Sequence, residues 1–112
     1  MPDETDPAYS HGSSKMDMVL SHVLYHINEK HDDIKNLLRS ESGDLFMKFL
    51  KNYLENLFQR YVKDFSSSVP EDFLLNHLVG SFAEAVKWWI LNDKEYTPDQ
   101  VAEYYMTVLK KV

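Results

Sequence analysis

Residues 68–92 read SVPEDFLLNHLVGSFAEAVKWWILN, and this stretch decides the fold. Its apolar residues recur at spacings of three and four, which is typical of an α-helix. Ser68 and Glu71 make a capping-box pattern before the apolar run, with Pro70 in the first turn, and Asn92 marks its end. Because apolar residues cover nearly the whole circumference, we expect this helix to be buried on more than one side.

The segment after it predicts a last helix. Thr97, Pro98 and Gln100 supply a cap residue, a first-turn proline and a capping-box glutamine. This helix also has two apolar faces. They consist of Val101, Tyr104, Tyr105 and Val108 on one side, and of Ala102, Met106 and Leu109 on the other.

Three more helices are predicted upstream, at about residues 15–30, 32–39 and 44–64. Ser14 and Asp17 cap the first. Its apolar stripe consists of Met16, Val19, Leu20, Val23, Leu24 and Ile27. The apolar face predicted for the third consists of Phe46, Phe49, Leu50, Tyr53, Leu57, Tyr61 and Phe65.

Residues 1–14 are polar and contain three breakers, so we interpret them as a flexible linker. Residues 15–112 then form one all-α domain, a bundle of about five helices. A chain with 3 Gly and 4 Pro among 112 residues has few helix breakers, in keeping with this class.

Charge and composition exclude several kinds of function. The net charge of −6 and the lack of a Lys/Arg cluster argue against a chain that grips nucleic acid by itself. The absence of Cys excludes disulfides. The sequence shows neither a signal peptide nor an apolar run that could span a bilayer, so a cytoplasmic location is expected.

The two-faced final helices predict a homodimer. One face of each helix packs within the monomer, and a second copy of the same helices can cover the other. Trp88 and Trp89 project about 100° apart on a helix, so one can lie in the monomer core and the other in an interface. The alternative places both in the core or at its edge. The predicted interface residues are Leu78, Phe82, Val86, Trp89, Val101, Tyr105 and Val108.

Three segments carry a family likeness. Residues 72–90, with a small residue, an aliphatic run and a Trp-aliphatic ending, resemble the penultimate helix of TetR-family C-terminal domains. Residues 96–105 resemble the last helix of that family, and residues 26–38 resemble its opening helix-break-helix. The likeness covers about residues 15–112.

The resemblance implies a domain that pairs through its last two helices into a four-helix bundle. It implies a pocket for a small-molecule effector. It also implies a helix-turn-helix head, which would be the only part that contacts DNA. That head is not seen here, although Pro7 to His11 resembles the joint that follows it. We therefore interpret the chain as an excised regulatory domain or a natural variant without the head.

Aromatic residues with a few polar groups suit an effector pocket. The predicted lining residues are Tyr25, Phe46, Phe49, Tyr53, His77 and Trp88. The alternative for each of them is ordinary core. Glu84 could orient a ligand, pair with Lys87 or Lys35, or lie at a solvated edge.

His22 and His26 have the i, i+4 spacing that can hold a metal ion, and His31 or His77 could join them in the fold. The alternative, which we favour, is a partly exposed or hydrogen-bonded pair. We therefore expect no metal and no cofactor. Without a phosphate loop, nucleophile elbow or HExxH motif, no enzyme is expected.

The sequence thus predicts a ligand-sensing and dimerising domain of a TetR-like regulator. The alternative is a stand-alone helical module that binds a partner protein through exposed apolar helix faces.

Overall fold

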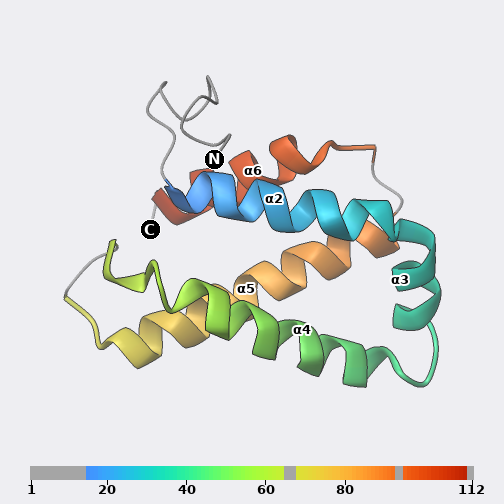
Figure 1. Ribbon diagram of the computed structural model, residues 1–112, viewed down its shortest axis with the longest axis horizontal. Helices are drawn as coiled ribbons and strands as arrows, with labels where there is room; N and C mark the ends of the chain where they lie inside the picture. Colours follow the sequence, from blue (N-terminus) through green and yellow to red (C-terminus); the bar gives the residue numbers. More distant parts are fainter. Residues whose placement is uncertain (1–14, 65–67, 93–94, 111–112) are drawn as a thin grey trace. The chain divides into compact units, whose positions relative to one another are not determined.

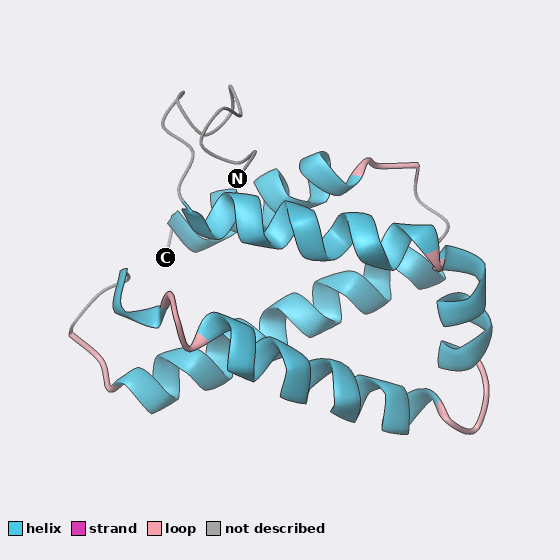
Figure 2. Ribbon diagram, in the orientation of Figure 1, coloured by secondary structure: helices cyan, strands magenta, loops and turns pink. Residues whose placement is uncertain are grey.

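The computed structural model describes residues 15–64, 68–92 and 95–110 (Figure 1). Within these ranges the elements are α2 (Lys15–Glu29), α3 (His31–Leu38), α4 (Gly43–Phe58), the 3-10 turn η2 (Val62–Asp64), α5 (Glu71–Leu91) and α6 (Pro98–Lys110). Figure 2 shows helices joined by loops and no strand in the described residues. The predicted all-α class with five helices is confirmed. The linker prediction for residues 1–14 lies outside the described residues.

The described chain divides into two units. The first unit holds α2 and α6, which pack along each other although they lie at opposite ends of the chain (Figure 1). Tyr25 of α2 donates a hydrogen bond of 2.9 Å from its hydroxyl to the Asp99 carboxylate in the first turn of α6. This hydrogen bond and the negative charge of Asp99, with a small contribution from desolvation, raise the pKa of Tyr25 above its usual value.

Both local predictions for this unit are confirmed. Five of the six apolar stripe residues of α2 are buried, and Val19 is half-buried. At the start of α6 the Gln100 backbone N–H donates to the Thr97 hydroxyl at 3.1 Å, and the Thr97 N–H donates to the Gln100 side chain at 2.8 Å. This reciprocal pair is a complete capping box, so α6 begins where the sequence predicts. The Ser14 cap falls outside the described residues.

The second unit holds α3, α4, η2 and α5. Helix α4 packs along α5, and α3 contacts both. The rings of Phe58 in α4 and Phe82 in α5 meet edge to face with centroids 5.7 Å apart. Both side chains are fully buried, so this contact joins the two helices in their shared core.

The end of α4 was wrongly predicted. The helix ends at Phe58 and not at Asp64, because the backbone tightens to three-residue hydrogen bonds, such as the 2.8 Å bond from the Tyr61 N–H to the Phe58 carbonyl. This tightening leads into η2, where Val62 is buried. The polar residues beyond Phe58 keep helical spacing, so the pattern gives no sign of the change.

The buried face of α4 was also wrongly predicted. The residues buried along it are Gly43, Met47, Leu50, Leu54 and Phe58. Of the predicted face only Leu50 is among them, and Phe49 is 61% exposed. Apolar residues occupy two sides of this helix, and the contacts with α3 and α5 select which side is buried.

The N-cap residue of α5 is Pro70 and not Ser68, the cap residue of the predicted capping box. Pro70 is in an extended conformation (φ −58°, ψ 142°) and makes no side-chain hydrogen bond to the helix. Helix α5 therefore begins at Glu71, three residues after Ser68. The predicted C-terminal end is confirmed, since Asn92 is the C-cap and donates from its side-chain amide to the Trp88 carbonyl at 2.8 Å.

Candidate functional site

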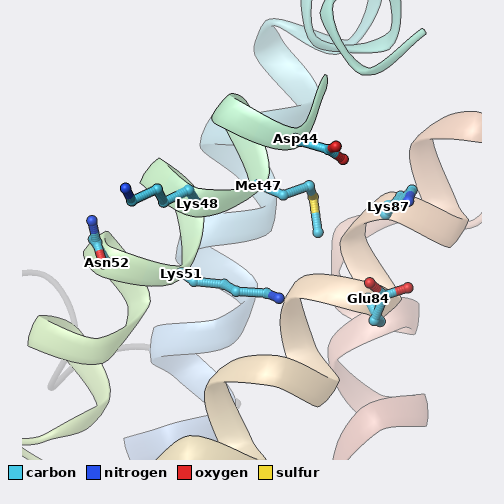
Figure 3. A pocket seen from close by; sticks show the side chains of 7 residues that line it. All are labelled: Asp44, Met47, Lys48, Lys51, Asn52, Glu84 and Lys87. Carbon is cyan, nitrogen blue, oxygen red and sulfur yellow. The ribbon is translucent and has the colours of Figure 1, made fainter. Parts of the chain in front are cut away.

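A hollow of about 400 Å³ lies between α4 and α5 (Figure 3). Its lining residues are Asp44, Met47, Lys48, Lys51, Asn52, Glu84 and Lys87. In Figure 3 the Lys51 side chain extends from α4 across the hollow toward Glu84 on α5, while Lys48 and Asn52 point away from α5. The hollow is large enough for a small metabolite, but its walls are mostly charged, unlike the apolar lining of a typical ligand pocket.

The charges around the hollow favour anions. Its three lysines and two carboxylates sum to +1, whereas the whole chain carries −6. In the described part of the chain, no ion pair within 4.0 Å joins Lys51 or Lys87 to a carboxylate. Both ammonium groups therefore have donors available for the oxygens of an anionic ligand.

The sequence-predicted pocket residues do not line this hollow. Tyr25 lies in the other unit, where it bonds to Asp99. The side chains of Phe49, Tyr53, His77 and Trp88 are exposed, and that of Phe46 is half-buried. The sequence did not predict the hollow, because the spacing of its lysines is the same as on any solvent-exposed helix face. Glu84, which we considered as a ligand-orienting residue, is the one signal that pointed to it.

The sequence-predicted interface residues are mostly inside the chain. Six of the seven are buried and only Val108, 63% exposed, has a large free surface. The two tryptophans differ sharply, since Trp89 is 2% exposed and Trp88 is 43% exposed. The surface that a second copy can reach is therefore that of Trp88 and not that of Trp89.

A continuous stripe runs along the exposed side of α5, opposite its buried residues. We call it the α5 stripe; its members are Phe73, His77, Gly80, Ser81, Glu84 and Trp88. The members recur at steps of three or four positions, with Gly80 and Ser81 adjacent, so they lie on one side of the helix. A Cβ added at Gly80 would meet no atom within 4 Å, so the middle of the stripe is open to a close approach.

Helices α6 and α4 also expose apolar side chains. On α6 these are Tyr104 and Val108, one turn apart, and the Tyr104 ring meets the ring of Tyr96 edge to face with centroids 5.4 Å apart. On α4 the exposed residues Leu45, Phe49 and Tyr53 follow one another at four-residue spacing. Each row is an exposed apolar edge of an amphipathic helix.

The histidines are spread over the two units. His22 and His26 form a hydrogen-bonded pair on α2, with their Nε2 atoms 3.1 Å apart. His31 lies in the other unit, with Nδ1 3.3 Å from an Asp32 carboxylate oxygen. His77 lies on the exposed side of α5. In the described ranges no group of three or more His, Asp or Glu side chains is placed to hold one metal ion.

The described residues form an all-α domain. The sequence profile of the TetR-type transcriptional regulator C-terminal region matches residues 15–111, so the chain belongs to that family. This is a family of regulatory domains and not of enzymes. No match was found among curated proteins or among solved structures. Among the described helices none has the length and apolarity that a membrane crossing requires.

Proposed function

We propose that this domain dimerises and senses a ligand on behalf of a TetR-like regulator in the cytoplasm. The observation that carries the proposal is the α5 stripe, in which Phe73 and Trp88 stay exposed although the opposite side of the penultimate helix is buried. DNA would be contacted by a helix-turn-helix head and not by this acidic domain. The domain would report ligand occupancy to two such heads through the dimer.

The α5 stripe has the features of a helix-helix contact. Phe73 and Trp88 are large anchors near its two ends, and aromatic anchors carry much of the energy of protein interfaces. Between them, Gly80 lets a facing helix come close. Separately, in the other unit, α6 exposes Tyr104 and Val108. A second copy presents the same residues, so an exposed row can pair with its own counterpart around a two-fold axis.

The dimer can be tested by sedimentation velocity. Trp88→Asp and Val108→Asp should each weaken self-association by about 30-fold or more, because each places a carboxylate in an apolar contact. Circular dichroism should show that the variants keep their helices, since both side chains are exposed. Phe49→Asp is the control, because Phe49 is 61% exposed, at least as much as Trp88 and about as much as Val108, but lies on α4.

The outcome separates the two candidate functions. If Phe49→Asp disrupts self-association and Trp88→Asp does not, the dimer uses the α4 row and the proposed interface is wrong. If the wild-type chain is a monomer at micromolar concentration, the exposed rows serve another protein. That result would favour the alternative of a helical interaction module.

The effector site that we propose is the hollow between α4 and α5, with a small polyanion as its ligand. Lys51 and Lys87 would bind carboxylate or phosphate oxygens, and Met47 also lines the hollow. Glu84 belongs both to the hollow and to the α5 stripe. An anion bound by the lysines would repel the Glu84 carboxylate, and this change at the dimer face would couple occupancy to dimer geometry.

Calorimetric titration with citrate and with inorganic pyrophosphate tests this site and distinguishes carboxylate from phosphate ligands. The Lys51→Gln and Lys87→Gln variants should each bind at least about tenfold more weakly, because each removes a charged hydrogen-bond donor. Lys63→Gln, on exposed η2, is the charge-matched control and should bind as the wild type does. Equal losses in all three variants would indicate general charge attraction and would count against the hollow.

A further inference from the structure

His22 and His26 present the same ring nitrogen to each other. Their Nε2 atoms are 3.1 Å apart, the ring centroids are 4.5 Å apart and the ring planes are nearly perpendicular, at 88°. Both side chains are exposed on α2, one helical turn apart. The backbone of the helix therefore holds two imidazoles close together at a point that solvent reaches.

The contacts of the pair indicate which nitrogens carry protons. Glu29 Oε1 lies 3.4 Å from His26 Nδ1, which favours the proton on that nitrogen. His26 Nε2 then has a free lone pair and accepts the hydrogen bond that His22 Nε2 donates. In this tautomer the Nε2 of His26 carries the lone pair that a metal ion requires.

We propose that His22 and His26 form a chelating site for a divalent late first-row transition metal: Cu²⁺, Ni²⁺ or Zn²⁺. With metal–nitrogen bonds of about 2.0–2.1 Å, two nitrogens 3.1 Å apart subtend an angle of about 98° at the metal. That angle lies between about 90° for neighbouring square-planar ligands and about 109° for tetrahedral ones. The ring separation therefore fits these ions with small side-chain adjustments.

Starting from two neutral rings, metal binding needs one proton shift and no net proton release. The ion takes the place of the shared proton, and the Nε2 proton of His22 moves to its own Nδ1 through solvent. Both rings stay neutral, and both Nε2 lone pairs bind the ion. Water supplies the remaining ligands, so the ion is held by two side chains and exchanges freely with solvent.

Glu29 is a positioning residue for this site. Its carboxylate faces His26 Nδ1, the nitrogen that does not bind the ion. A carboxylate there holds the orientation and tautomer of a ligating histidine and raises its basicity. The three residues span the second half of α2, so the ion would also stabilise this part of the helix. This proposal does not depend on the effector hollow or on the dimer.

The test is titration of the full chain with Cu²⁺, followed by calorimetry and by electron paramagnetic resonance. We expect one ion per chain with two equatorial nitrogen ligands. His22→Gln and His26→Gln should each lower the affinity by more than about tenfold and leave one nitrogen in the spectrum. Ni²⁺ and Zn²⁺ should raise the Tm of the wild type but not of these variants, whereas Mg²⁺ should have no effect.

The chain supplies its own matched controls. His31→Gln and His77→Gln should bind Cu²⁺ as the wild type does, and so should a variant of His11, which lies outside the described residues. Glu29→Gln should lower the affinity by roughly tenfold, and Glu103→Gln, an exposed residue of α6, should not. Loss of binding in a control histidine variant, or one nitrogen ligand in the wild type, would overturn the two-histidine site.

Discussion

Replacing Trp89 with alanine is expected to lower the free energy of unfolding by about 3–5 kcal/mol, the usual cost of removing a large aromatic from a core. Trp89 is the largest of the fully buried side chains, and at 2% exposure it has almost no contact with water. Domains of this size are commonly stable by about 5–15 kcal/mol, so the substitution would remove a large part of the total. Urea denaturation followed by circular dichroism measures the change.

Trp88→Ala is the matched control, because it makes the same chemical change one residue earlier on the same helix. Trp88 is 43% exposed, so its removal should cost about 1 kcal/mol or less in the unfolding experiment. It should instead weaken self-association, since Trp88 belongs to the α5 stripe. A Trp88→Ala variant less stable than Trp89→Ala would mean that the two side chains are assigned to the wrong sides of α5.

Adding one methyl group at Gly43 and at Gly80 is expected to have opposite effects. A Cβ at Gly43, where α4 begins, would lie 2.5 Å from the carbonyl oxygen of Leu38, the last residue of α3. Because the contacting atom belongs to the backbone and not to a flexible side chain, the junction between α3 and α4 must shift to admit the methyl group. Gly43→Ala should therefore lower the free energy of unfolding by about 1–3 kcal/mol.

Gly80→Ala should stabilise the fold by about 0.5–1 kcal/mol, because alanine favours a helix interior and no atom lies within 4 Å of the added Cβ. Denaturation at low protein concentration measures this gain apart from association. Sedimentation of the same variant should show a weaker dimer, since the methyl group would stand in the middle of the α5 stripe. A Gly43→Ala variant as stable as the wild type would show that the α3–α4 junction is not tightly constrained.

Several features of this protein could be predicted from the sequence because they depend on near neighbours. The capping box of Thr97 and Gln100 needs only residues within one turn, and both of its hydrogen bonds form. The α2 stripe is a single row, so it admits one buried side. The close pair of His22 and His26 likewise follows from their i, i+4 spacing.

The features that were missed are ones for which the sequence pattern is compatible with more than one arrangement of the helices. Helix α4 has apolar residues on two sides, and contacts with α3 and α5 bury the side of Met47 and Leu54 and expose that of Phe49. The hollow needs lysines and carboxylates from α4 and α5, and its lining residues on the two helices are more than thirty positions apart in the chain.

Residues 68–92 show most clearly which features depend on the sequence alone and which depend on tertiary packing. Its helical spacing by itself determined that it forms one long helix ending at Asn92, because the period of apolar residues is a local property. Which of two adjacent tryptophans is buried was decided only by tertiary structure. Both are large and apolar, and only the packing of α5 places Trp89 inside and leaves Trp88 exposed.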